Sequence, residues 1–131
     1  MFRTLTVAML VFLSLNLSAK ALDCANAQTQ FDMNQCADLD WQRADKALNA
    51  EYKRARARMR QLDQDLPANL EGAEIALRDA QRAWIKYRDA ACVAEGFLFR
   101  GGTMEPLIVS TCMASLTEAR TRGLQTLSQT N

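Results

Sequence analysis

The stretch from Met33 to Leu62, MNQCADLDWQRADKALNAEYKRARARMRQL, decides the fold. Apolar and small side chains return in it at steps of three and four, which is the spacing of one face of an α-helix. The resulting stripe is about eight helical turns long. Thr29 is placed to cap the start of this helix, and Asp32 completes a sequence of the capping-box type. The members of the stripe are Met33, Ala37, Trp41, Ala44, Leu48, Tyr52, Ala55, Met59 and Leu62.

A second stripe follows after a break over residues 61–69, where Pro67 interrupts the helical pattern. Its steps alternate between three and four as in a heptad seam, and Asp65 is a candidate cap for its helix. Two long helices joined by so short a connection are expected to fold back as an antiparallel pair. The members of this stripe are Leu70, Ala73, Leu77, Ala80, Trp84, Tyr87, Ala91 and Ala94.

A third helix is expected after the glycine-containing segment 96–105 and runs to about Leu127. Thr103 is its candidate N-cap, and Pro106 is tolerated in a first helical turn. Glycine and proline are scarce elsewhere, while alanine, glutamine, leucine and arginine are abundant, which favours helix. The sequence therefore predicts an all-α fold, an antiparallel bundle of two long helices and a shorter third.

Residues 1–21 have the features of an export signal. Arg3 gives a basic start, an apolar run covers 5–17, and Ala19-Lys20-Ala21 fits a small-x-small cleavage site. We expect cleavage before Leu22, which leaves residues 22–131 as one helical domain of a periplasmic or extracellular protein. The apolar run is shorter than the roughly 20 residues of a membrane span.

Asp23 precedes the first cysteine, where a lipoprotein signal would need a small residue. We therefore expect neither a lipid anchor nor any other stable membrane anchor after signal cleavage.

Four cysteines lie beyond the expected cleavage site, at Cys24, Cys36, Cys92 and Cys112. In an oxidising compartment they are expected to form two structural disulfides, for which three pairings exist. Local pairing, Cys24–Cys36 and Cys92–Cys112, is the simplest, and each bond would contribute about 3 kcal/mol. Redox-active and zinc sites are the alternatives, but both usually require a C-x-x-C spacing that is missing here.

Charge and composition exclude several classes of protein. Removing Arg3 and Lys20 with the export signal leaves 14 basic and 15 acidic side chains, a net charge of −1. This balance argues against nucleic-acid binding and predicts little long-range attraction toward a charged partner. The chain has no histidine, the commonest general base and a common metal ligand. We therefore expect no catalytic residues, no metal site and no cofactor.

Two charged residues lie about one position away from the apolar stripes, Asp45 in the first helix and Arg88 in the second. Charges at such positions are half-buried and need partners, so we expect an Asp45–Arg88 ion pair that sets the register of the two helices. A catalytic Asp45 is the alternative, but no second acid or base shares its helical face. The basic run 53–60 is expected to be a solvated helix surface rather than an anion site.

The segment between the second and third helices is the candidate partner-binding loop. It combines aromatic side chains, one cation and two adjacent glycines between rigid elements, a setting in which binding residues concentrate. The alternative is that the aromatic residues only cap the end of the core. The residues in question are Phe97, Phe99, Arg100, Gly101, Gly102 and Thr103.

Several segments together resemble the lysozyme inhibitor LprI family, over about residues 23–127. The resemblance implies an all-helical, cysteine-bearing envelope protein, some members of which inhibit lysozyme. The segments are Asp23-Cys24, Met33-Asn34-Gln35-Cys36-Ala37, Ala44-Asp45, Leu48-Asn49, Tyr52, Ala80-Gln81-Arg82-Ala83-Trp84-Ile85-Lys86-Tyr87-Arg88-Asp89, Cys92, Gly101-Gly102-Thr103, Cys112, Thr117 and Arg120.

A protein inhibitor of lysozyme must fill a sugar-binding cleft that contains two carboxyl groups. Arg100 with Gly101, Gly102 and Thr103 is the element that we expect to enter such a cleft. The competing interpretation is an envelope module that binds another protein or is purely structural. An enzyme is disfavoured, because the sequence shows neither a nucleophile paired with a base nor a phosphate-binding loop.

Overall fold

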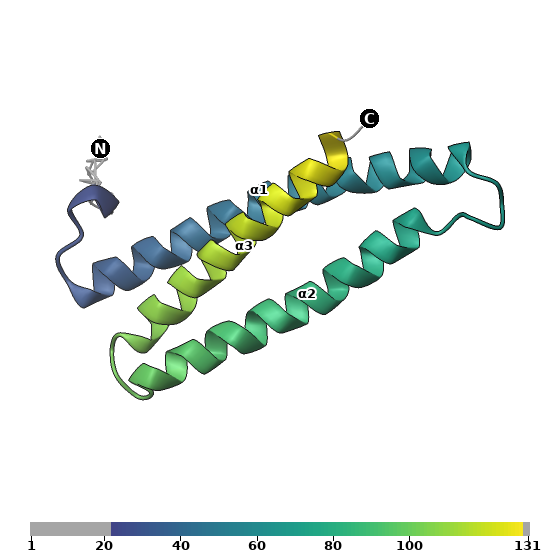
Figure 1. Ribbon diagram of the computed structural model, residues 1–131. Helices are drawn as coiled ribbons and strands as arrows, with labels where there is room; N and C mark the ends of the chain where they lie inside the picture. The colour runs from purple at the N-terminus through teal and green to yellow at the C-terminus, as the bar shows by residue number, and fades with distance from the viewer. Residues whose placement is uncertain (1–21, 130–131) are drawn as a thin grey trace, which may run out of the picture.

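Three long helices account for most of residues 22–129, the part of the chain that this computed structural model describes (Figure 1). No strand occurs within these residues, and the predicted all-α fold is confirmed. The expected export signal, residues 1–21, lies outside the described part. The elements are η1 (Cys24–Asn26), α1 (Gln30–Asp65), α2 (Ala73–Gly96), η2 (Phe97–Phe99) and α3 (Glu105–Gln129).

The first helix begins where the sequence predicts and ends later. The Thr29 hydroxyl accepts the backbone N–H of Asp32 at 3.1 Å, which caps the N-terminus of α1. The break expected from Gln61 begins only at Leu66, the residue before Pro67. A side-chain hydrogen bond from Gln61 to Asp65 spans the last turn, and no glycine or proline interrupts the helix before Pro67.

The turn between α1 and α2 is held by Asp63 and not by the predicted cap, Asp65. The Asp63 carboxylate accepts the backbone N–H groups of Gly72, Ala73 and Glu74 at 2.9, 2.8 and 3.0 Å. These bonds lower the pKa of Asp63, and the bond from the Glu74 N–H contributes most to this shift. A side chain of α1 thus supplies the N-terminal cap of α2 and fixes the turn between them.

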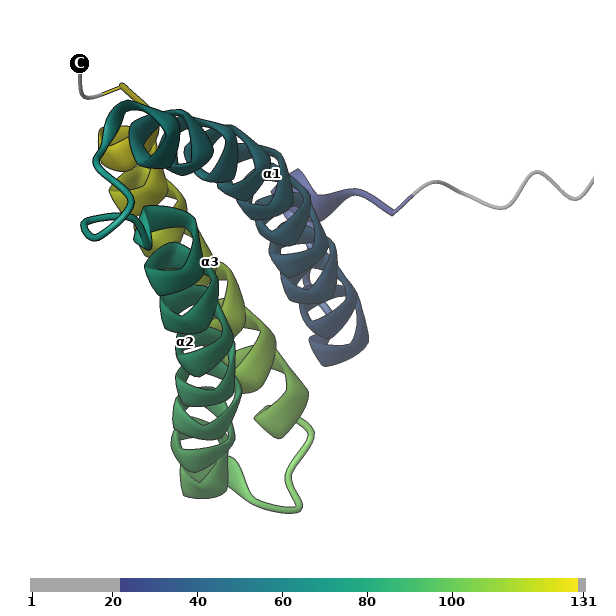
Figure 2. The ribbon, with the colours of Figure 1, turned by 90° about the vertical axis from the view of Figure 1, so that its right-hand side faces the viewer.

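The third helix is the main partner of α1 (Figures 1 and 2). Figure 2 shows α1 and α2 diverging from their connection, with α3 along both. Buried alanines on α1, Ala37, Ala44 and Ala55, leave room for the close approach of a neighbouring helix. The third helix was expected to be shorter than the other two, but α3 has 25 residues and α2 has 24.

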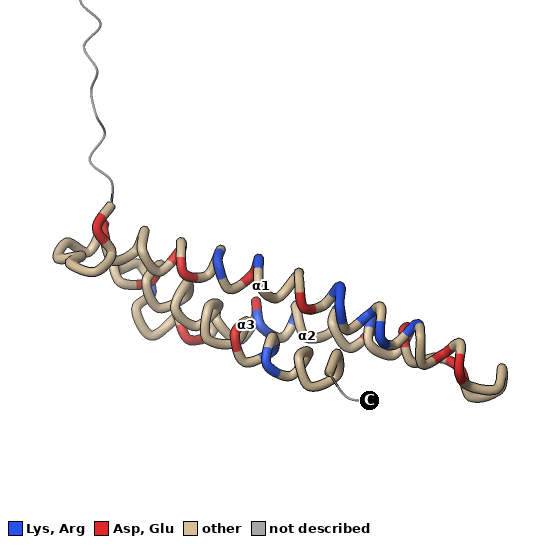
Figure 3. The backbone as a smooth tube through the Cα atoms, turned by 90° about the horizontal axis from the view of Figure 1, so that it is seen from above, with Lys and Arg blue, Asp and Glu red and all other residues tan. Residues whose placement is uncertain are grey.

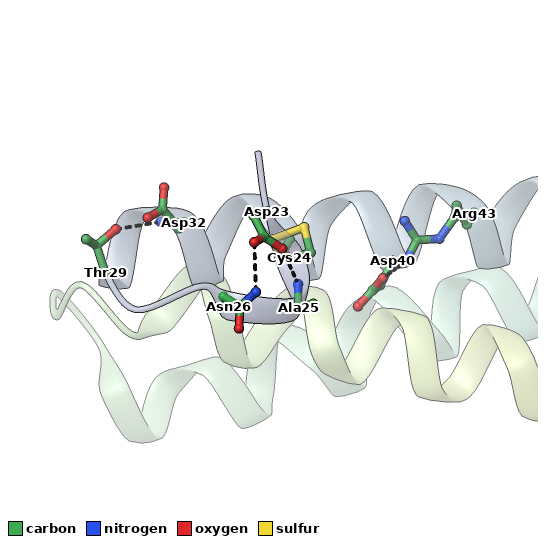
Figure 4. Close-up of a disulfide and its surroundings, with 9 residues drawn as sticks. Asp23, Cys24, Ala25, Asn26, Thr29, Asp32, Asp40 and Arg43 are labelled. Atoms are coloured by element: carbon green, nitrogen blue, oxygen red, sulfur yellow. Dashed lines mark hydrogen bonds and ion pairs between the residues drawn. A yellow bond between two sulfur atoms is a disulfide. The ribbon is translucent and has the colours of Figure 1, made fainter. Parts of the chain in front are cut away.

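Two disulfides clamp the bundle, and they follow the local pairing. Cys24–Cys36 ties η1 to the second turn of α1, and Figure 4 shows this bond beside the Asp23 side chain. That carboxylate accepts from the Ala25 N–H and the Asn26 amide, which closes η1. Cys92–Cys112 joins the end of α2 to the start of α3.

Two apolar clusters fill the bundle, one on each side of a polar layer. The layer is formed by Arg88 and Thr117, whose exposed fractions are only 6% and 0%, with Asp45 bonded to Arg88; Gln81, 4% exposed, lies two turns before Arg88 on α2. The first cluster, toward the α1–α2 connection, contains Leu48, Ala55, Leu77 and Leu124, with Tyr52, Met59, Trp84 and Leu127 packed against it. The second, toward the other end, contains Cys92, Cys112 and Met113, with Trp41, Val109 and Leu116 packed against it.

The buried face of α2 is rotated from the predicted stripe. Tyr87 is 62% exposed, and Leu70 is 59% exposed and precedes the helix, so both were wrongly assigned to the core. The reason is that polar side chains with partners take core positions that an apolar pattern gives to their neighbours. The buried residues of α2 are Leu77, Gln81, Arg88, Cys92 and Gly96.

Arg88 connects all three helices. Its Nη1 donates to Asp45 Oδ1 of α1 at 3.2 Å and to Thr117 Oγ1 of α3 at 3.3 Å. Its Nε donates to Asp89, and its guanidinium lies over the Trp84 and Trp41 rings, 5.2 and 5.9 Å from their centroids. Beside it, Arg120 of α3 donates to Gln81 of α2 at 2.9 Å.

The basic run of α1 is partly an interhelical contact and not only a solvated surface. Arg56 and Arg60 both pair with the Glu74 carboxylate of α2. Arg56 also lies over the Tyr52 ring of its own helix, 5.8 Å from the centroid. These contacts join α1 and α2 close to their connection.

A buried carboxylate holds the end of α3. Glu51 of α1 is 2% exposed and accepts hydrogen bonds from Arg54 and from the Ser128 hydroxyl. The bond from Arg54, followed by that from Ser128, lowers the pKa of Glu51. Because this pKa is lower in the folded than in the unfolded state, Glu51 stabilises the fold above the ordinary glutamate pKa. That contribution is lost as the pH falls through the folded-state pKa.

We predict that Arg88→Ala lowers the free energy of unfolding by about 3 kcal/mol, because it leaves Thr117 and the two tryptophans without their partner. Asp45→Ala should cost about 1 kcal/mol, because Asp45 is partly exposed and Asp89 remains beside the guanidinium. Urea unfolding of both variants and the double variant measures the coupling. Arg82→Ala, an exposed arginine of α2, is the matched control. Unfolding midpoints equal to that of the parent would contradict the role of the layer.

We also predict that Glu51→Gln lowers stability at pH 7 by about 1 kcal/mol, since a neutral amide replaces a charged acceptor. The difference from the parent should shrink as the pH falls below the ordinary glutamate pKa, because the parent then loses the contribution of its charged carboxylate. Urea midpoints at several pH values test this, with Glu118→Gln, an exposed acid of α3, as control. A difference independent of pH would show that charge is not the cause.

Candidate partner-binding surface

The segment between α2 and α3 closes one end of the bundle, beside the start of α1 (Figure 1). The Cys92–Cys112 disulfide joins the two flanking helices. Cys92 lies one turn before this segment, and Cys112 lies two turns after it. Gly96, the last residue of α2, lies tightly against α3, because a Cβ there would lie 2.6 Å from Val109 Cγ2. The chain therefore leaves α2 tightly against α3 and turns outward.

The loop itself is a series of tight hydrogen-bonded turns. The Arg100 N–H donates to the Phe97 carbonyl at 3.2 Å, and the Gly102 N–H donates to the Phe99 carbonyl at 2.9 Å. Gly101 has a φ of +77°, a conformation that favours glycine. The predicted N-cap Thr103 lies one residue early, because the Met104 carbonyl accepts the first helical bond of α3, from Ile108.

Glu105, the first residue of α3, ties the loop together. Its carboxylate accepts the Gly101 N–H at 2.8 Å and Arg100 Nη1 at 2.7 Å. The bond from Gly101, with a smaller contribution from Arg100, lowers the pKa of Glu105. The Arg100 guanidinium is also stacked over Phe97, 4.8 Å from the ring centroid. The candidate cation is thus 63% exposed but already paired.

The apolar side chains of the loop face solvent. Leu98 is 81% exposed, Phe97 57% and Phe99 37%, so the interpretation that they merely cap the core does not describe them. Met104 completes the rim of a hollow of about 530 Å³ at this loop. Exposed apolar groups gathered in this way are typical of interaction sites.

The start of α1 extends this surface. The Asn34 amide donates to the Thr103 carbonyl at 3.0 Å and accepts from Gln30 at 2.8 Å. Phe31, one turn before Asn34, is 67% exposed. We call the set Phe31, Phe97, Leu98, Phe99 and Met104 the end surface.

Sequence reasoning found the loop but missed what α1 and α3 add to it. Asn34 and Thr103 are 69 residues apart, and no local pattern links them. Glu105 carried a usable signal, because an acid in the first turn of a helix can accept backbone N–H groups of the preceding loop.

Within residues 22–129, no three acidic, cysteine or histidine residues are grouped as metal ligands would be. Asp45, for which the sequence left a catalytic role as an alternative, accepts hydrogen bonds from Arg88 and Asn49. No helix in the described part of the chain combines the length and apolar character needed to cross a bilayer.

The fold and the end surface define a disulfide-clamped three-helix module that presents apolar side chains at one end. The family model described as "Lysozyme inhibitor LprI" matches residues 23–124, and the chain belongs to the LprI family. Membership in this family and the two disulfides indicate an exported protein.

Two known proteins illustrate the relationship. An uncharacterized protein of Rhizobium meliloti (strain 1021) is 48% identical over 108 residues, which cover 80% of this chain and 78% of that protein. The crystal structure of a DUF1311 family protein from Pseudomonas putida KT2440 superposes with a TM-score of 0.67 at 24% identity. The superposed region covers 80% of this chain and 97% of the other. At 24% identity the likeness supports only the fold.

We predict opposite effects for two helical glycines. Gly96→Ala should destabilise the protein by about 1–3 kcal/mol, because its Cβ would overlap the stiff Val109 side chain. Gly123→Ala should stabilise it by roughly 0.5–1 kcal/mol, because nothing lies within 4 Å of its added Cβ. Thermal and urea unfolding measure both. Equal effects of the two substitutions would contradict the tight contact between α2 and α3.

Proposed function

We propose that this protein is a non-enzymatic binding protein of the cell envelope that inhibits lysozyme by occluding the lysozyme cleft. The single observation that carries the proposal is the exposed apolar loop at one end of a disulfide-clamped bundle in a member of the LprI family. Rigid support on both sides lowers the entropic cost of presenting such a loop to a partner. We place the protein in the periplasm or outside the cell.

The loop has the chemistry that the cleft of a lysozyme requires. Leu98 and Phe97 supply apolar contact area that is largely exposed in the unbound protein. Gly102 and Thr103 give a narrow backbone that can approach a cleft wall. Arg100 would exchange its bond to Glu105 for a cleft carboxylate, while the Gly101 N–H continues to satisfy Glu105.

The alternative is an envelope module that uses the same surface for another protein. The pairing of Arg100 with Glu105 favours it, because a cation already bonded contributes less to a new carboxylate. In that case the apolar side chains, and not Arg100, would supply most of the affinity.

We predict that the oxidised protein slows the lysis of bacterial cell walls by hen-type or goose-type lysozyme. Leu98→Ser should raise the concentration needed for half-inhibition about tenfold, the effect of losing roughly 1.4 kcal/mol of binding energy. Leu70→Ser is the matched control, because Leu70 is 59% exposed near the opposite end of the bundle. That variant should inhibit like the parent.

Two results would count against the proposal. Failure of the parent protein to inhibit either lysozyme would remove lysozyme as the partner, and equal inhibition by Leu98→Ser would remove the loop as the contact. Arg100→Ala separates the two roles within the loop, since unchanged inhibition by this variant would show that the arginine does not enter the cleft.

A further inference from the structure

The charges of this protein are separated along the bundle. The layer around Arg88, Asp45 and Thr117 divides the described chain into a loop-side half, residues 22–45 and 88–117, and a far half, residues 46–87 and 118–129. The loop-side half holds eight acidic and three basic side chains, while the far half holds seven acidic and eleven basic ones. The small net charge of the chain is therefore the difference between a negative and a positive half. Figure 3 shows the blue segments of α1 concentrated in its C-terminal half.

The cations of the loop-side half are all neutralised within it. Arg43 pairs with Asp40 (Figure 4), Arg88 with Asp45 and Asp89, and Arg100 with Glu105. Four carboxylates of this half have no lysine or arginine of the described chain at ion-pair distance. They are Asp23, Asp32, Asp38 and Glu95. The end surface therefore lies in a region of uncompensated negative charge.

We propose that the end surface docks a cationic protein, and that the separation of charge orients this partner onto the loop end. This proposal rests on the proposed function, which assigns partner binding to the end surface. It adds that the partner is positively charged. Apolar side chains supply the contact area, and the surrounding carboxylates raise the rate of encounter with a positive partner.

Distance makes the two halves act separately. The 36 residues of α1 span about 54 Å, whereas charges are screened over about 8 Å at physiological ionic strength. A partner at the loop end therefore experiences the local negative charge and not the net charge of the whole chain. The expectation of weak long-range attraction, drawn from the net charge, does not apply to this elongated molecule.

A second copy of this chain is the competing occupant. Two loop ends repel each other, so self-association would have to join the negative loop end of one molecule to the basic run 53–60 of the next. Sedimentation of the parent protein at low salt tests this, and concentration-dependent chains of molecules would overturn the proposal. A monomer under these conditions supports it.

The decisive experiment compares two charge-reversal variants of equal net charge. Asp38→Lys with Glu95→Lys reverses two carboxylates of the loop-side half, and Asp65→Lys with Glu71→Lys reverses two of the far half. Association with hen-type lysozyme, a cationic protein, is measured at 20 and 200 mM salt. The loop-side variant should associate about tenfold more slowly at low salt, with a smaller difference at high salt, and the far-half variant should stay within about threefold of the parent. Equal slowing by both variants, or by neither, would overturn the proposal while leaving inhibition itself intact.

A second measurement does not depend on lysozyme. A short peptide of lysines and tryptophans is added to the isotope-labelled protein, and chemical shifts are followed by NMR. A matched peptide of glutamates and tryptophans is added in a parallel titration. Shifts at the end surface with the lysine peptide alone support a cationic partner even where lysozyme fails to bind. Equal shifts with both peptides, shifts confined to the far half, or no shifts would overturn it.

Discussion

Arg88 lies at the centre of the bundle with almost no access to water, and a cation in that position must be bonded or the fold loses several kcal/mol. Its partners come from different helices, Asp45 from α1 and Thr117 from α3, while Trp41 and Trp84 cover its two sides. All three helices must therefore bring these groups to one level. A shift of α1 or α3 by one turn would remove Asp45 or Thr117 from the guanidinium, which is a stronger restriction on register than apolar packing alone provides.

The helix register set by this layer also positions the groups that meet at the loop end. With the helices aligned at Arg88, Cys92 and Cys112 meet to form their disulfide, and Asn34 reaches the Thr103 carbonyl. Gly96 allows α2 to lie so close to α3 that a Cβ at this position would overlap Val109. Leu98, two residues later, is therefore exposed on a loop that follows a tightly packed helix end and is itself held by hydrogen bonds.

Local features of the fold could be predicted from the sequence. Apolar spacing located the helices, and short separation identified the disulfide pairs. Of the contacts between side chains distant in sequence, the Asp45–Arg88 pair was predicted from two charges beside the apolar stripes, but the others were not. Asp63 caps a helix nine to eleven residues later, Glu51 holds Ser128 across 77 residues, and Arg88 takes a core position that Tyr87 was expected to fill. In each case a polar group is held by a partner from another part of the chain. The apolar pattern of the sequence contains no information about that partner.

The same distinction applies to charge. The net charge describes the attraction that a partner experiences only where the molecule is about as small as the screening length. This bundle is several times longer than that. Acidic residues gather where α1 begins and α2 ends, and the antiparallel return of α2 brings these two segments to one end. Basic residues gather in the second half of α1, over residues 53–60, whereas the last turn of α1 and the first turn of α2 carry acidic residues. Topology therefore brings the acidic start of α1 and the acidic end of α2 together, and it places this negative charge around the exposed apolar side chains. The chemistry of that end selects for positive charge in a partner, a broader criterion than the identity of any one enzyme.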